Sequence, residues 1–230
     1  KNRVEEICYT AHKFGLKVLI DAEETWIQPA IDELTQEMMK RFNKKEAQIY
    51  NTLQMYRTDR LDYLKERLQE AKAEDYKLGV KLVRGAYMEK ERERAQEKGY
   101  PDPIQPSKEA SDKSFNDGVQ FVIENLEQMS IVAGTHNEDS SFYLAELMEK
   151  HEVAKNDRRI WFSQLYGMSD NLSFNLAKEG YNVVKYLPFG PVQETLPYLI
   201  RRAEENSAAG GQTSREMKLI ERELKRRGLD

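Results

Sequence analysis

Two adjacent arginines in a late helical segment are the most informative chemical feature of the sequence. Within ETLPYLIRRAEEN, four side chains are spaced i, i+3, i+4 and i+7 and share one helix face: Tyr198, Arg201, Arg202 and Glu205. Neighbouring guanidinium groups can hold a carboxylate or a phosphate through paired hydrogen bonds. The same spacing is typical of a solvent-facing polar stripe, opposite an apolar one. The spacing alone leaves both interpretations open.

Carboxylates follow an apolar run that has the length of a buried strand. In KVLIDAEE, the alternation of a strand would place Asp21 and Glu23 on the same side. Such a pair can bind a metal ion, act as a general base, or neutralise the charge of Arg201 and Arg202. An ordinary pair of loop carboxylates is the remaining alternative.

A second strand-like run ends in KLVRGAYMEKER. Gly85 and Ala86 would allow a flat ligand to approach the backbone closely, with Lys81 and Arg84 stabilising negative charge on it. Tyr87 and Tyr186 each stand at the end of a predicted strand. They suit the walls of a pocket for a small apolar ring, although a boundary tyrosine with its hydroxyl in water explains each position equally well.

His136, in GTHN, directly follows another predicted strand. A single histidine is more often structural than catalytic, and the three histidines of the chain are too scattered to predict a metal site. The common nucleotide-binding loops, the HExxH and CxxC motifs and the signatures of nucleophilic triads are all missing. We therefore expect neither zinc chemistry nor a serine or cysteine nucleophile.

Short apolar runs alternate with helical patterns along the chain. The predicted strands are 17–22, 48–54, 80–86, 130–135, 160–165 and 182–187, and the helices between and after them are 30–42, 58–74, 108–128, 140–151, 169–179 and 194–206. Six such repeats predict an α/β protein with parallel strands, either a TIM-type barrel or a doubly wound sheet. Polar residues follow nearly every strand, which favours the barrel because its site is built from all the strand ends.

Composition narrows the function classes. The 230 residues carry 36 Lys and Arg against 40 Asp and Glu, a net charge of −4, which argues against a nucleic-acid-binding protein. No apolar run approaches the roughly 20 residues that a membrane-spanning helix needs. The single cysteine, Cys8, excludes an intrachain disulfide and fits a reducing compartment.

Several of these segments together resemble the catalytic domain of proline dehydrogenases. The matching segments are IDAEE (20–24), KLVRGAYMEKERERAQ (81–96), GYPDPIQP (99–106), THNEDS (135–140), QLYGMSD (164–170) and KYLPFGPVQETLPYLIRRAEEN (185–206). The resemblance covers about residues 15–207. It is closer to the monofunctional and eukaryotic-type enzymes than to the large bifunctional bacterial ones.

This resemblance implies roles for individual residues. Arg201 and Arg202 would hold the carboxylate of proline, and Asp21 would orient the pair, chiefly Arg202. The implied lining of the substrate pocket is Tyr87, Leu165, Tyr186 and Tyr198. The implied FAD contacts are Gln54, Lys81, Val83, Arg84, Gly85, Ala86, His136, Asn137, Gln164 and Glu205. The family often has arginine at the position of Lys81, and the strand-end glutamine stands one residue late, with Ser163 in its expected place.

The activity implied is FAD-dependent oxidation of L-proline to 1-pyrroline-5-carboxylate, with hydride transfer to flavin N5 and electrons passed to a quinone. Tyr186, where a smaller residue would suit hydroxyproline, favours proline itself. Such an enzyme would be peripheral to the inner membrane in a bacterium and mitochondrial in a eukaryote. The alternatives are a dehydrogenase for hydroxyproline or another cyclic imino acid, and a non-catalytic barrel fragment that requires another chain.

The family barrel has eight strands, whereas six are predicted here. We therefore expect the chain to form one domain, 1–230, that supplies strands three to eight. A helix at 1–16 would precede the third strand, and a C-terminal helix would occupy 212–230. The first two strands of the barrel would lie outside this sequence.

Overall fold

The computed structural model describes residues 1–208 and 212–229, and for part of the last two helices it describes the backbone alone. The chain divides into two compact units, Lys1–Tyr186 and Leu187–Asp230. The prediction that 1–230 forms a single domain stays a prediction, and the two units are described separately.

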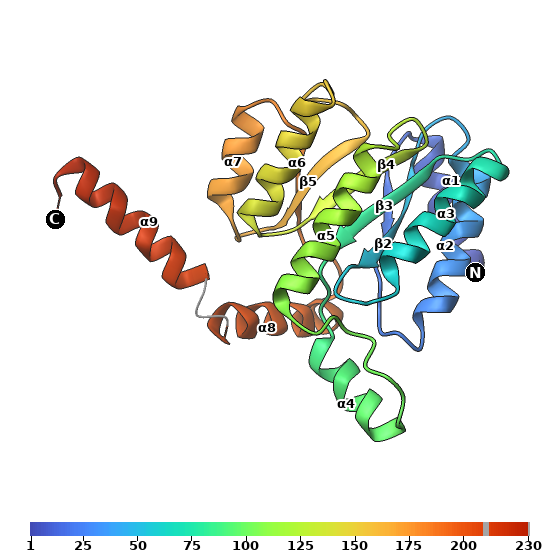
Figure 1. Ribbon diagram of the computed structural model, residues 1–230, viewed down its shortest axis with the longest axis horizontal. Helices are drawn as coiled ribbons and strands as arrows, with labels where there is room; N and C mark the ends of the chain where they lie inside the picture. Colours follow the sequence, from blue (N-terminus) through green and yellow to red (C-terminus); the bar gives the residue numbers. More distant parts are fainter. Residues whose placement is uncertain (209–211, 230) are drawn as a thin grey trace. The chain divides into compact units, whose positions relative to one another are not determined.

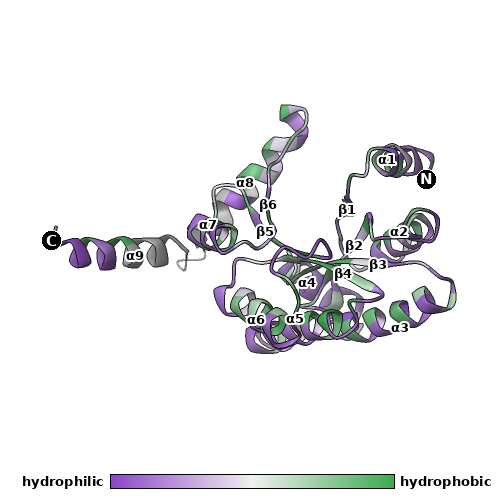
Figure 2. Cartoon of the chain, turned by 90° about the horizontal axis from the view of Figure 1, so that it is seen from above, coloured by the Kyte–Doolittle hydropathy of each residue, from purple (hydrophilic) through white to green (hydrophobic). Residues whose placement is uncertain are grey.

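The first unit is built on a six-stranded parallel sheet whose strands follow one another in chain order. The strands are β1 (Val18–Ile20), β2 (Ile49–Gln54), β3 (Leu78–Val83), β4 (Met129–Gly134), β5 (Ile160–Leu165) and β6 (Val183–Tyr186). The sheet curls into a half-barrel, with β1 and β6 forming its two rims in the view from above (Figure 2). The TIM-type architecture expected from the sequence is confirmed.

Helices connect the strands, and most of them lie against the sheet, whereas α4 extends away from it (Figure 1). They are α1 (Asn2–Lys13), α2 (Gln28–Phe42), α3 (Arg60–Ala73), α4 (Met88–Lys98), α5 (Lys108–Ile123), α6 (Glu138–Lys150) and α7 (Asp170–Lys178). All six predicted strands are present, with shifts of up to three residues at their ends. The predicted helix 108–128 ends earlier, at Ile123, and the amide of Asn125 donates to the Phe121 carbonyl (2.8 Å) in the turn that follows.

Alternation along the strands separates two faces of the sheet. Leu53, Leu82 and Phe162 lie on the helix-facing side and are at most 1% exposed, within one continuous apolar core. The opposite, concave face carries polar side chains, among them Thr52 and Lys81, which are register partners on β2 and β3. Burial of apolar groups beneath the helices therefore leaves the concave face for polar chemistry.

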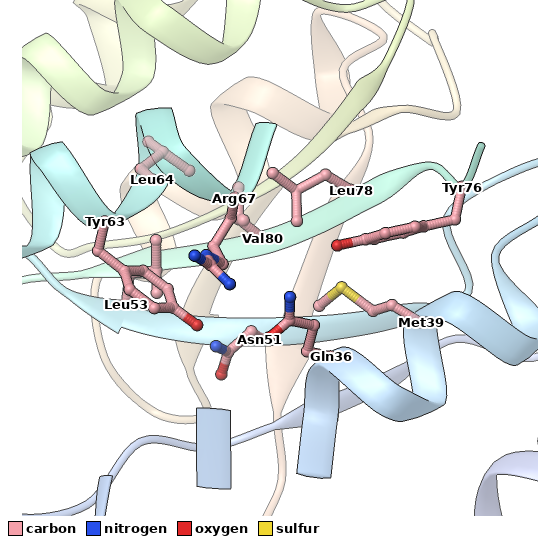
Figure 3. Close-up of a pocket in the computed structure, with 10 residues that line it drawn as sticks. All are labelled: Gln36, Met39, Asn51, Leu53, Tyr63, Leu64, Arg67, Tyr76, Leu78 and Val80. Atoms are coloured by element: carbon pink, nitrogen blue, oxygen red, sulfur yellow. The ribbon is translucent and has the colours of Figure 1, made fainter. Parts of the chain in front are cut away.

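A small cavity lies on the helix-facing side, between α2, α3 and the strands β2 and β3 (Figure 3). Its lining residues are Gln36, Met39, Asn51, Leu53, Tyr63, Leu64, Arg67, Tyr76, Leu78 and Val80. The volume of about 10 Å³ is that of a single water site, so this cavity is too small for an amino acid.

The second unit contains α8 (Val192–Ala208) and α9 (Gln212–Arg227). On α9, Glu223 pairs with Arg226 at 2.6 Å and with Arg227 at 2.7 Å. Within the described residues, no helix is both long enough and apolar enough to cross a membrane.

Candidate active site

The carboxyl ends of the six parallel strands lie along one edge of the half-barrel, and the sequence-predicted residues of the first unit lie at or near this edge. The most central contact joins three strands. Lys81 Nζ, on β3, donates to Asp21 Oδ1, just after β1, at 2.6 Å, and Thr52 Oγ1 on β2 donates to the same oxygen at 3.3 Å. The Asp21 side chain is 55% exposed and that of Lys81 16%, so the pair borders the open side of the sheet.

Gln54 ties the loops after β1 and β3 together. Its amide donates to the carbonyl of Glu23 at 2.7 Å and accepts from the backbone N–H of Ala86 at 3.3 Å. The Tyr87 hydroxyl donates to Glu23 Oε2 at 2.5 Å. Gln54 is almost fully buried, so these bonds fix the two loops relative to each other.

Arg84 faces away from the concave side, toward α5 and α6. Its guanidinium donates to Asp112 Oδ1 (2.5 Å), Thr135 Oγ1 (2.7 Å) and Ser140 Oγ (2.9 Å), and it lies 4.7 Å from the centre of the Phe115 ring. The side chain expected to contact a cofactor is thus engaged by the protein at each of its three nitrogens. Arg84 therefore holds the end of β3 from the helix-facing side of the sheet.

The contact with Arg84 affects the pKa of the Asp112 carboxyl. Burial by itself would raise the pKa of its carboxyl, but hydrogen bonds from Lys108 and Arg84 outweigh that effect and hold the pKa below its ordinary value. A carboxyl whose pKa is lower in the folded state contributes stability above the unfolded pKa and loses it as the pH falls.

We therefore expect Arg84→Met to lower the free energy of unfolding by about 2–4 kcal/mol at pH 7, because Asp112 and two hydroxyls lose a partner in a mostly buried site. Urea unfolding at several pH values measures this loss. The difference in the free energy of unfolding between the variant and the parent should decrease as the pH falls from about 5 to about 2, because Asp112 becomes protonated.

Lys113→Met is the matched control for Arg84→Met. Lys113 pairs with Asp117 on the exposed side of α5, with 74% of the lysine side chain in solvent. Such a pair contributes less than about 1 kcal/mol. Equal losses in the two variants would contradict a structural role for Arg84.

The ends of β4 and β5 contribute His136, Asn137 and Gln164. His136 Nδ1 is 3.0 Å from Ser169 Oγ, and Asn137 Oδ1 accepts the N–H of Ser140 (3.0 Å) at the start of α6. The Gln164 amide lies on the helix-facing side, donating to the Thr135 carbonyl (3.2 Å) and accepting from Ser173 (3.0 Å). The structure therefore does not place the Gln164 side chain on the concave face, because strand alternation gives that direction to Ser163.

Leu165 and Tyr186 are register partners at the ends of β5 and β6, and Tyr186 is 42% exposed. In the second unit, the guanidinium of Arg202 lies 5.2 Å from the centre of the Tyr198 ring, which confirms that these two side chains share a helix face. The side chains of Arg201 and Glu205 lie outside the described residues. The orientation of Arg202 by Asp21 stays a prediction, since these residues belong to different units.

The segments that form this edge match a known family. The family model described as "Proline dehydrogenase" matches residues 1–215. The chain belongs to the proline dehydrogenase family.

Individual relatives agree with this family assignment. The chain is 42% identical over 228 residues to "Proline dehydrogenase 1, mitochondrial" of Homo sapiens, covering 98% of this chain and 38% of the human protein. It is 39% identical over 229 residues to "Hydroxyproline dehydrogenase" of Xenopus laevis, covering 98% of this chain and 49% of the frog protein. The chain therefore spans less than half the length of either relative.

The fold has counterparts among solved structures. Proline utilization A from Bdellovibrio bacteriovorus superposes with a TM-score of 0.82, at 24% identity, over 89% of this chain and 21% of that protein. The identity to the human relative, 42%, is higher than the identity to this structure.

Three further residues shape the edge in this family member without having been singled out in the sequence: Thr52, Tyr56 and Glu91. Thr52 stands two positions before Gln54, so strand alternation alone would have placed both on one face. The Tyr56 ring packs against the backbone at Gly85. Glu91 is hidden within a run of charged residues, where hydropathy carries no signal for its burial.

Proposed function

We propose that the chain carries the strand-end site of an FAD-dependent dehydrogenase that oxidises L-proline to 1-pyrroline-5-carboxylate. Membership of the family supports the reaction class. The observation that carries the proposal is the Lys81–Asp21 pair on the concave face, tied through Gln54 to the Gly85–Ala86 turn. A cation, a carboxylate and a side-chain-poor stretch of backbone then lie at one edge of the sheet.

The residues present fit a flavin. Gly134 and Ala86 keep the ends of β3 and β4 free of bulky side chains, which suits a flat ring system, whereas the Tyr56 ring takes the place of a Cβ at Gly85. Lys81 provides a cation that would stabilise negative charge developing on the ring system, and Val83 provides an apolar contact on the same face. Residues that would hold FAD are Gln54, Lys81, Val83, Gly85, Ala86, His136, Asn137 and Glu205.

Arg84 and Gln164 would support this site indirectly, since their polar atoms bond to neighbouring loops and helices. When bound, FAD supplies the hydride acceptor at its N5.

The remaining residues would bind and orient the substrate. Arg201 and Arg202 would hold the carboxylate of proline through paired, charge-assisted hydrogen bonds. The walls for the five-membered ring would be Tyr87, Leu165, Tyr186 and Tyr198. Fixing the carboxylate orients the reacting C–H bond, which lowers the entropic part of the barrier. Asp21 would balance the positive charge of the arginines and of Lys81.

The electrons would pass to a quinone, so the protein would contact a membrane at its surface. Relatives named mitochondrial support a mitochondrial location in a eukaryote; in a bacterium the protein would be cytoplasmic and peripheral to the inner membrane.

The absorption spectrum of the protein after incubation with FAD tests the proposal. We expect a retained flavin band near the usual ~450 nm that bleaches when L-proline is added without oxygen. Protein that retains no flavin contradicts catalysis by this chain and supports a barrel portion that requires another chain. A flavin band that bleaches faster with hydroxyproline than with proline contradicts the assignment of proline as the substrate. The alternative substrate would then be hydroxyproline, as the name of the frog relative suggests.

A further inference from the structure

Glu91 is a fully buried carboxylate outside the set of residues that would bind substrate or FAD. It lies in the first turn of α4, which starts one residue after Tyr87. The helix is mostly charged, and its buried residues are Glu91, with no exposed surface, and Ala95. Removing a charged carboxylate from water is costly unless hydrogen bonds replace the lost hydration. The burial of Glu91 therefore requires specific partners.

Both oxygens of Glu91 are bound by one residue of the loop between β1 and α2. The backbone N–H of Thr25 donates to Oε1 at 2.6 Å, and the Thr25 hydroxyl donates to Oε2 at 2.7 Å. Hydrogen bonds to an ionised acceptor are about twice as strong as neutral ones, and the paired geometry fixes direction as well as distance. Residue 25 is thus held on α4 by its backbone and its side chain together.

Neighbouring contacts extend this attachment along the loop. Lys90 forms an ion pair with Glu24, and the guanidinium of Arg94 lies 4.2 Å from the centre of the Trp26 ring. Together with the Thr25–Glu91 bonds, these contacts clasp residues 24–26 on the first two turns of α4.

The clasp lies next to the residues assigned to the reaction. Residues 21–27 join β1 to α2, so an anchor at Thr25 restricts the backbone that carries Asp21. Tyr87 is joined directly to α4, and its hydroxyl reaches Glu23 in the same loop (2.5 Å). A shift of the loop relative to α4 would therefore break the Tyr87–Glu23 bond and change where the Asp21 carboxylate stands relative to the Tyr87 hydroxyl.

We propose that Glu91 is a positioning residue. By holding Thr25 on α4, it sets where Asp21 and Tyr87 stand at the edge of the sheet. The effect on catalysis rests on the proposed function, whereas the attachment of residues 24–26 to α4 is a property of the fold. A misplacement of about 1 Å can reduce catalysis by about a hundredfold, so a residue that touches no substrate can control the rate.

Hydrogen exchange of the Thr25 amide tests the clasp independently of activity. In Glu91→Gln, one carboxylate oxygen becomes an amide nitrogen that cannot accept, and we expect exchange at residues 21–27 to accelerate at least about tenfold. Glu93→Gln, which changes an exposed carboxylate on the same helix, is the matched control and should leave exchange unchanged. Equal exchange in the two variants would overturn the proposal.

Thr25→Val provides a second route that leaves Glu91 in place. It removes the hydroxyl donor and keeps the N–H donor, so an intermediate acceleration is expected. In the double variant, the acceleration of exchange should be well below the product of the two single accelerations, because both changes disrupt one contact. Fully multiplicative effects would contradict the clasp.

Turnover then tests positioning. With FAD bound, kcat/KM for L-proline should fall at least about tenfold in Glu91→Gln and stay unchanged in Glu93→Gln, with Glu91→Asp, which keeps the charge, recovering part of the loss. Accelerated exchange with unchanged kcat/KM would overturn the positioning role. A parent protein that binds FAD but oxidises no proline would count against the proposed function alone, since exchange still decides whether the clasp exists.

Discussion

Replacing Gly85 with alanine is expected to destabilise the first unit by about 3 kcal/mol and to abolish flavin retention. Gly85 has φ +142°, a backbone conformation that residues with a Cβ rarely adopt. An added Cβ would lie 2.5 Å from Cδ1 and Cζ of Tyr56, a side chain that is only 4% exposed. The ring cannot withdraw without disturbing the core, so backbone strain and overpacking act together. Urea unfolding measures the loss of stability, and the flavin spectrum measures the loss of the site.

Gly99→Ala separates the two causes. Gly99 has φ +71° at the end of α4, and an added Cβ there would meet no atom within 4 Å. Its cost should be about 1 kcal/mol from backbone strain alone. In the Gly85→Ala protein, Tyr56→Leu should restore part of the stability by removing the clash. A Gly85→Ala protein no less stable than Gly99→Ala would show that the Tyr56 contact does not constrain this turn.

Replacing Arg202 with alanine is expected to raise KM for L-proline by about a hundredfold while FAD occupancy is retained. The proposal gives Arg202 a charge-assisted contact to the substrate carboxylate, and contacts of that kind contribute about 1.5–3 kcal/mol each. Its guanidinium lies over the Tyr198 ring, a contact that favours one relative orientation of the two side chains. Steady-state kinetics with an artificial electron acceptor, alongside a flavin titration, provides the measurement.

Two further variants define the role of Arg202. Arg202→Lys keeps the charge but loses the planar pair of donors, so it should recover only part of the lost affinity. Arg222→Ala removes an exposed arginine from α9 and should change neither parameter. Proline kinetics that are unchanged in Arg202→Ala would remove the assignment to the carboxylate. A loss of FAD equal to the loss of proline affinity would assign Arg202 to the cofactor instead.

Much of the first unit follows from the sequence because its signals are local. The apolar runs around Leu53, Leu82 and Phe162 are short and bounded by polar residues, which is the pattern of strands buried beneath helices. Their repetition with intervening helices leaves few parallel topologies, and the positions of Asp21 and His136 at strand ends follow from the same pattern. The family was identifiable from the segments around these positions.

The directions and partners of the side chains required the tertiary structure. Lys81 meets Asp21 across 60 residues, Arg84 reaches Asp112 and Ser140, and Glu91 accepts hydrogen bonds from Thr25. These contacts depend on the register of neighbouring strands and on where α4 and α5 pack, quantities that hydropathy periodicity does not encode. The sequence by itself thus determined which residues come to the edge of the half-barrel. The tertiary structure decided which of them face the concave side and which bond to the helices on the other side of the sheet, because a side chain's surroundings are set by elements distant in the chain.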